Sequence, residues 1–173
     1  FSLDHSKYHL ILHPTSKGSA REWGNENFEN LVRLLPKENF TLYLCGLESD
    51  RTKLAPLLEK CDGEFFIDCI GKFNLSTYIN FIQAADGLIA NSTGPLHIAA
   101  LSNKDAFGIY PPIKPMHPGR WSPIGKYSQV FVLDKSCESC RHSQEACACM
   151  LAIQPMAVAE AIKQARQRKL NKL

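Results

Sequence analysis

The chain alternates short apolar runs with segments in which apolar residues recur every three or four positions. The runs are rich in Leu, Ile, Val and Phe and predict strands, whereas the longer periodic segments predict helices. We expect strands at residues 9–14, 40–46, 64–71, 86–91, 106–112 and 129–134. We expect helices at residues 25–39, 48–61, 74–86, 95–102 and 154–170.

This order of elements indicates the fold class. Several strands are continuous apolar runs, which is typical of parallel strands that helices cover on both faces. Strands that alternate with helices favour an α/β fold with a Rossmann-like doubly wound parallel sheet. We expect a single domain over residues 1–173, with Asn25 as the N-cap of the first helix and an ordered loop at 111–128.

Composition narrows the class of protein. The net charge of +3, from 20 basic and 17 acidic residues, is too small to favour nucleic acid binding. No apolar run approaches the ~18 residues that a membrane helix needs. Seven cysteines without a secretory leader favour a cytoplasmic setting, in which Cys45, Cys61 and Cys69 are buried thiols. Because the chain begins with Phe1 rather than Met, we expect it to be part of a larger protein.

The segment NSTGPLHIAA, residues 91–100, carries candidate chemistry at the start of a helix. Ligands of α/β sheets bind beyond the carboxyl ends of the strands, and helix N-termini bind phosphate there. Ser92 or Thr93 can cap the helix, Gly94 allows a ligand close to the backbone, and His97 can donate to a phosphate oxygen. The alternative is an ordinary capped helix whose histidine only packs.

The loop HPTSKGSAREW, residues 13–23, repeats this logic after the first strand. Its hydroxyls and cations are of the kind that hold a diphosphate, although a solvated polar loop is the alternative. The candidates are Thr15, Ser16, Lys17, Ser19 and Arg21. Neither the P-loop pattern nor the glycine pattern of dinucleotide-binding domains is present.

Taken in order, four segments resemble the C-terminal domain of glycosyltransferase family 9, the ADP-heptose:lipopolysaccharide heptosyltransferases. They are LHPTSKGSAREW (12–23), LCGLESDR (44–51), GKFNL (71–75) followed by ADGLIANSTGPLHIAA (85–100), and PGRWSPIG (118–125). The resemblance covers nearly the whole chain, and 85–100 is its most specific part. It implies one half of a GT-B glycosyltransferase: the donor-binding domain, inactive without an N-terminal domain that holds the acceptor and the catalytic base.

The resemblance also implies which residues bind the nucleotide-sugar donor. Thr15 and Ser16 would contact the donor diphosphate, Arg21 would supply the cation, and Lys17 is a further donor-binding candidate of this loop. Asp50, or Glu48 as its rival, would hold the ribose, and Phe73 would pack against adenine. The remaining donor-binding residues are Ser92, Thr93, Gly94 and His97. Many members carry Asp where this chain has Ser92, a departure that bears on which sugar is bound.

The implied reaction is an inverting transfer of heptose from ADP-heptose to the inner core of lipopolysaccharide. No metal is expected to be required, because protein donors can stabilise the charge that develops on the leaving diphosphate. The resemblance also implies a bacterial, cytoplasmic enzyme, with peripheral association with the inner face of the inner membrane as a further expectation. Alternatives are another GT-B nucleotide-sugar protein, such as a 2-epimerase-like enzyme, and a non-catalytic nucleotide-binding module with a zinc staple.

A cysteine cluster lies before the last helix. Its members are Cys137, Cys140, Cys147 and Cys149, with His142 as a substitute ligand. This set suits a structural zinc ion, with disulfides and free thiols as the alternatives. In each case we expect the cluster to lie apart from the chemistry, because the donor site is assigned to other loops.

Overall fold

The computed structural model describes residues 1–61, 63–135 and 147–171. Within these residues, all strands pair in parallel in one sheet with the order β3-β2-β1-β4-β5-β6. The strands are β1 Tyr8–His13, β2 Phe40–Leu44, β3 Phe66–Asp68, β4 Gly87–Asn91, β5 Asp105–Ile109 and β6 Ser128–Phe131. Because the chain moves outward from β1 to β3 and then returns to the other side of β1, the strand order reverses between β1 and β4.

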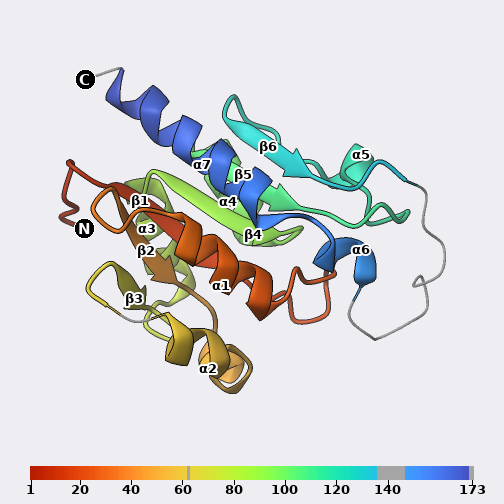
Figure 1. Ribbon diagram of the computed structural model, residues 1–173, viewed down its shortest axis with the longest axis horizontal. Helices are drawn as coiled ribbons and strands as arrows, with labels where there is room; N and C mark the ends of the chain where they lie inside the picture. The colour runs from red at the N-terminus through yellow and green to blue at the C-terminus, as the bar shows by residue number, and fades with distance from the viewer. Residues whose placement is uncertain (62, 136–146, 172–173) are drawn as a thin grey trace.

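Helices cover both faces of the sheet, as the expected doubly wound fold requires. Side chains of α1 Asn25–Leu34, α2 Arg51–Lys60 and α7 Pro155–Leu170 share one core cluster. Those of α3 Leu75–Ala84 and α4 Gly94–Leu101 share a second cluster on the opposite face. Figure 1 shows α1 and α7 on the near face, with the start of the chain and the last turn of α7 away from α5 and α6. The short helices are η1 Glu48–Asp50, α5 Pro118–Trp121 and α6 Ala148–Leu151.

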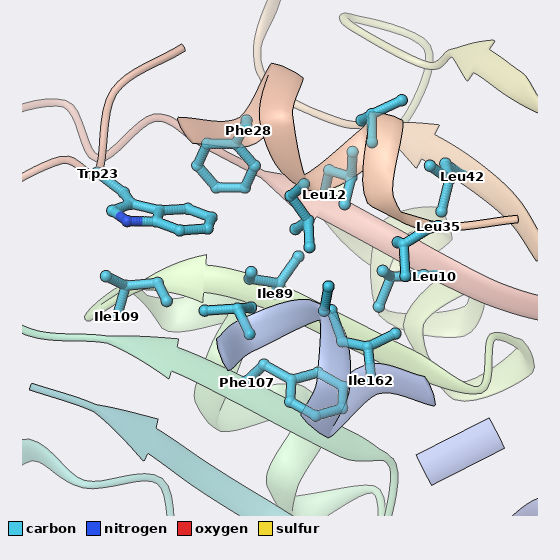
Figure 2. Packing of buried hydrophobic residues seen from close by; sticks show 14 of the residues in the cluster. Leu10, Leu12, Trp23, Phe28, Leu35, Leu42, Ile89, Phe107, Ile109 and Ile162 are labelled. Atoms are coloured by element: carbon cyan, nitrogen blue, oxygen red, sulfur yellow. The ribbon is translucent and has the colours of Figure 1, made fainter. Parts of the chain in front are cut away.

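The two cores follow from the alternation of side chains along each strand. In β1, Leu10 and Leu12 belong to the cluster under α1 and α7, whereas Ile11 belongs to the cluster under α3 and α4. Figure 2 shows the first cluster, in which Phe107 and Ile162 pack from β5 and α7. Each fully buried Leu, Ile or Phe side chain contributes roughly 1.5–3 kcal/mol to the stability of the fold. Packing on both faces of the sheet therefore holds the ends of the strands in place.

The structure changes some expected boundaries. Asn25 is the first residue of α1 and not its N-cap. The N-cap is Gly24, which has a φ of 91°. The side chain of Asn25 instead donates to Lys53 O at 2.7 Å. The 111–128 loop contains the short helix α5. The strand expected at 106–112 ends at Ile109, before two prolines that lack the amide proton a strand needs.

Two other sequence expectations concern burial and membranes. Cys45, Cys61 and Cys69 are buried, as expected. None of the helices in the described part of the chain has the length and apolar character of a membrane-spanning segment.

Candidate functional site

The loops that follow β1 and β4 are joined by one buried side chain at the point where the strand order reverses. Asn91, the last residue of β4, accepts a hydrogen bond from Trp23 N at 3.0 Å and donates from Nδ2 to Pro14 O at 2.6 Å. The side chain is fully buried. It therefore fixes both ends of the first loop against β4. Sequence reasoning did not single out Asn91, although a polar residue that ends a buried apolar strand is a recognisable signal.

A cavity of about 290 Å³ opens beside this junction. Three segments that are distant in sequence line it: the first loop, the start of α4 and the loop after β5. Its lining residues are Ser19, Ala20, Ser92, Thr93, Gly94, His97, Pro111, Met116 and Trp121. The two loops that sequence reasoning selected thus share one cavity at the carboxyl end of the sheet.

The amino end of α4 forms the polar wall of the cavity. Thr93 is the N-cap residue, but its hydroxyl donates to Asn91 O at 3.2 Å and does not cap the helix. Pro95 occupies the first turn, where a missing amide proton costs little. A methyl group added at Gly94 would meet no atom within 4 Å, so the backbone there is open to a ligand. With the half-buried His97, this end of the helix suits an anion.

The predicted residues of the first loop are divided between the cavity and the interior. Ser19 lines the cavity, whereas Thr15 and Ser16 are buried and do not. Thr15 donates to Asp50 Oδ2 at 3.0 Å. The amide of Ser16 donates to Glu22 Oε1 at 2.9 Å, and its hydroxyl lies 2.8 Å from Ala20 O. These bonds stabilise the loop, so direct contact of Thr15 and Ser16 with a diphosphate stays a prediction.

The two cations of the loop also lie outside the cavity lining. Lys17 is exposed and has a φ of 49°, the left-handed region that precedes Gly18 in the turn. Arg21 is half-buried. Their assignment to the diphosphate stays a prediction as well.

The two carboxylates that follow β2 differ in their surroundings. Asp50 Oδ2 also accepts from Leu47 N at 2.9 Å, so this carboxylate holds the loop to Thr15. The Glu48 side chain is 67% exposed and pairs with Arg51 at 2.6 Å. The Arg51 guanidinium keeps the pKa of Glu48 below its usual value. Of the two ribose-binding candidates, Glu48 therefore has the carboxylate that is more accessible to a ligand.

An aromatic cluster lies near these carboxylates. Phe73 stacks on Tyr78 with ring centroids 6.2 Å apart and also contacts Phe81. His13, at the end of β1, stacks on Tyr78 and shares a hydrogen bond with its hydroxyl at 2.9 Å. Burial lowers the pKa of His13 to about 4, against the attraction of the Asp50 carboxylate, so the imidazole is neutral near pH 7. His13 therefore packs within the protein, against Tyr78.

Apart from those of the first loop, the predicted site residues thus form two groups at the carboxyl end of the sheet. Ser92, Thr93, Gly94 and His97 meet in the cavity. Glu48, Asp50 and Phe73 follow β2 and β3 and do not line it. Parallel strands bring both groups to the same edge of the sheet, with β1 between them.

The cysteine cluster is described only in part. Cys137, Cys140 and His142 lie outside the described residues. Cys147, the N-cap residue of α6, and Cys149, within α6, are buried. In the described part of the chain, no three His, Cys, Asp or Glu side chains gather as metal ligands would. The structural zinc ion therefore stays a hypothesis about the sequence.

Residues 2–151 match glycosyltransferase family 9 (heptosyltransferase). Lipooligosaccharide heptosyltransferase 2 of Haemophilus influenzae is 25% identical over 103 residues, which are 58% of this chain and 30% of that protein. The chain spans about a third of the length of the curated relatives that it matches.

Solved structures show the same fold. The structure of E. coli ADP-heptose lps heptosyltransferase II superposes with a TM-score of 0.80 at 20% identity and covers 97% of this chain and 49% of its own. E. coli heptosyltransferase WaaC with ADP has a TM-score of 0.70 at 16% identity and covers 92% and 45%. This coverage is expected for one Rossmann-like half of a GT-B glycosyltransferase. The match over residues 2–151 shows that the chain belongs to glycosyltransferase family 9.

Proposed function

We propose that this chain is the donor-binding domain of an inverting heptosyltransferase that transfers heptose from ADP-heptose to the inner core of lipopolysaccharide. The observation that carries the proposal is the shared cavity, in which the open amino end of α4 and His97 face the first loop. Support for the nucleotide comes from the solved relative that is described with ADP.

The chemistry would develop negative charge on the diphosphate. An acceptor hydroxyl forms the new bond to the anomeric carbon while the bond from that carbon to the diphosphate oxygen breaks and ADP leaves with the electron pair. Amides at the start of α4 and the imidazole of His97 would stabilise this charge as donors in place before the reaction. The general base and the acceptor site would lie in the other half of the enzyme.

The same assignment of the donor site bears on the need for a metal ion and on where the enzyme works. Because protein donors can serve the diphosphate, we expect donor binding to need no divalent metal. We also expect the full enzyme to work in the cytoplasm, with peripheral association with the inner face of the inner membrane, where a lipid-linked acceptor would be met.

Nucleotide titration by calorimetry tests the proposal on this chain. We expect ADP to bind more tightly than UDP or NAD, with the same affinity in EDTA and in magnesium. His97→Ala and Arg21→Ala should each weaken ADP binding by roughly 1–3 kcal/mol, the usual effect of losing a charge-assisted hydrogen bond. His5→Ala is the matched control, because His5 is exposed and precedes β1 at the opposite end of the sheet.

The other outcomes point to the alternatives. A preference for UDP would favour another GT-B nucleotide-sugar protein, and a preference for NAD or no binding at all would contradict the assignment. Unchanged ADP affinity in both the His97 and Arg21 variants would remove these residues from the site.

A further inference from the structure

The cavity has an aromatic wall that the diphosphate assignment does not use. The Trp121 side chain lines it, and the residue is 46% exposed. Trp23, the other tryptophan of the chain, is fully buried and donates from Nε1 to Ile153 O at 2.9 Å. What distinguishes this ring from the other exposed apolar side chains is its place in the cavity wall, where it offers an apolar surface that a ligand can bury.

The position of Trp121 is fixed by its backbone and not by burial of its ring. The buried Tyr110 donates from its hydroxyl to Trp121 O at 2.6 Å. Ser122 N donates to Pro118 O at 2.8 Å and closes the short helix α5. The Arg120 guanidinium lies over the indole, 5.2 Å from its centroid. Because this cation lies over one face of the ring, a ligand would stack on the other face.

The cavity lining divides into an apolar and a polar part. Pro111 and Met116 flank Trp121 in the loop after β5, whereas hydroxyls and an imidazole come from the first loop and α4. A pyranose has the same division, since its C–H bonds form apolar faces and its hydroxyls form a polar rim. A diphosphate needs only the polar part, because it has no apolar face to bury.

Cavity size agrees with this division. About 290 Å³ is near the lower limit of the ~300–1,000 Å³ found for ligand pockets. That space suits a sugar with its neighbouring phosphates better than a complete nucleotide sugar. The nucleoside would then extend toward Glu48 and Phe73, which lie outside the cavity.

We propose that Trp121 binds the transferred sugar by stacking its indole against the apolar face of the pyranose. Trp121 is then a specificity-determining residue that recognises the sugar and not the nucleotide. The inference rests on the proposed donor-binding function and adds a contact to it. It separates two parts of one ligand: α4 binds the diphosphate, and the loop after β5 binds the sugar.

Binding of ADP and ADP-heptose to variants of this chain tests the inference. Trp121→Ala should weaken ADP-heptose about tenfold and leave ADP within about twofold, because only the sugar stacks on the indole. Trp121→Phe should retain most of the ADP-heptose affinity, since it keeps an aromatic face. Ile124→Ala is the control, because Ile124 lies in the same loop, is 83% exposed and does not line the cavity.

Tryptophan fluorescence gives a second readout. The chain has two tryptophans, and Trp23 is fully buried, so acrylamide should quench mainly Trp121. ADP-heptose should protect this emission from acrylamide, whereas ADP should protect it little. Equal protection by both ligands would show that the nucleotide, and not the sugar, covers the ring.

The possible failures are distinguishable. Unchanged ADP-heptose affinity in Trp121→Ala, or an equal loss for ADP, overturns the inference while the donor-binding function stands. Failure of the unaltered chain to bind either ligand overturns the proposed function and this inference with it.

Discussion

At the scale of single residues, the protonation of His13, at the end of β1, makes the stability of the chain depend on pH. Its folded pKa of about 4 lies below the usual 6.5, so the unfolded chain takes up this proton first as pH falls. Stability from this group is therefore complete above pH 6.5 and is lost between about 6.5 and 4, by at most about 3 kcal/mol. Urea unfolding across this range should show the loss, and His13→Phe, which keeps a ring beside Tyr78, should reduce the slope.

The control for this prediction is another histidine. His5 is exposed, so His5→Gln should unfold with the pH slope of the unaltered chain. If His13→Phe also keeps that slope, His13 is not the group whose protonation is linked to unfolding.

At the residue scale, the sequence predicts which side chains can donate hydrogen bonds but not which partner each one contacts in the folded chain. The hydroxyls of the first loop were recognised as donors, but Thr15 donates to Asp50 within the protein. Asn91, which joins the two loops, was overlooked because its partners at Trp23 and Pro14 are 68 and 77 positions away. A short stretch of sequence shows which residue types are present. It does not show the partner, distant in sequence, whose hydrogen bond fixes the direction of each side chain.

At the scale of elements, the position of α4 on the sheet determines the shape of the cavity. A methyl group at Gly108 in β5 would lie 2.8 Å from Leu96 Cδ2 and 2.5 Å from the Tyr110 ring. Gly108→Ala should therefore move α4 and destabilise the chain by about 1–3 kcal/mol, as overpacking does. It should also weaken ADP binding.

Gly94→Ala is the matched substitution at the amino end of α4. Its methyl group meets no protein atom within 4 Å, so the free energy of unfolding should not fall. ADP affinity should nevertheless fall several-fold, because the methyl group would occupy the space of the ligand. Thermal unfolding and calorimetry separate the two effects, and undiminished ADP affinity in Gly94→Ala would place the diphosphate elsewhere.

Prediction from sequence was strongest at this scale. All six expected strands and all five expected helices are present, because the strands have distinct apolar runs and the helices have apolar residues at helical spacing. The short helices α5 and α6, of four residues each, escaped prediction because one turn is too short to show a period.

At the scale of the whole molecule, α7 is tied to the amino ends of the central strands by ion pairs. Arg168 pairs with Asp105, which also accepts from the Tyr8 hydroxyl at 2.6 Å, and Lys169 pairs with Asp86 at 2.8 Å. The Asp105 side chain is only 12% exposed. Asp105→Asn should therefore cost about 2–3 kcal/mol of stability in urea unfolding, since it leaves Arg168 poorly compensated.

Glu160→Gln provides the comparison on the same helix. Glu160 pairs with Lys163 but is 53% exposed, so its loss should cost less than about 0.5 kcal/mol. Similar costs for the two substitutions would contradict a special role for the pairs at the end of α7.

Fold class was predictable at this scale, whereas strand order was not. Alternating strands and helices indicate a doubly wound sheet, but the reversal between β1 and β4 depends on pairing between distant strands. The cavity depends on that reversal, so its lining could be predicted only in part.

Asn91 has a consequence for synthesis of the chain. The first loop leaves the ribosome nearly seventy residues before the side chain that fixes it to β4. A nascent chain that ends before Asn91 therefore lacks the junction beside the cavity, even when residues 13–23 are complete. Competence to bind a donor should consequently arise only after Asn91 and the cavity residues that follow it have been synthesised.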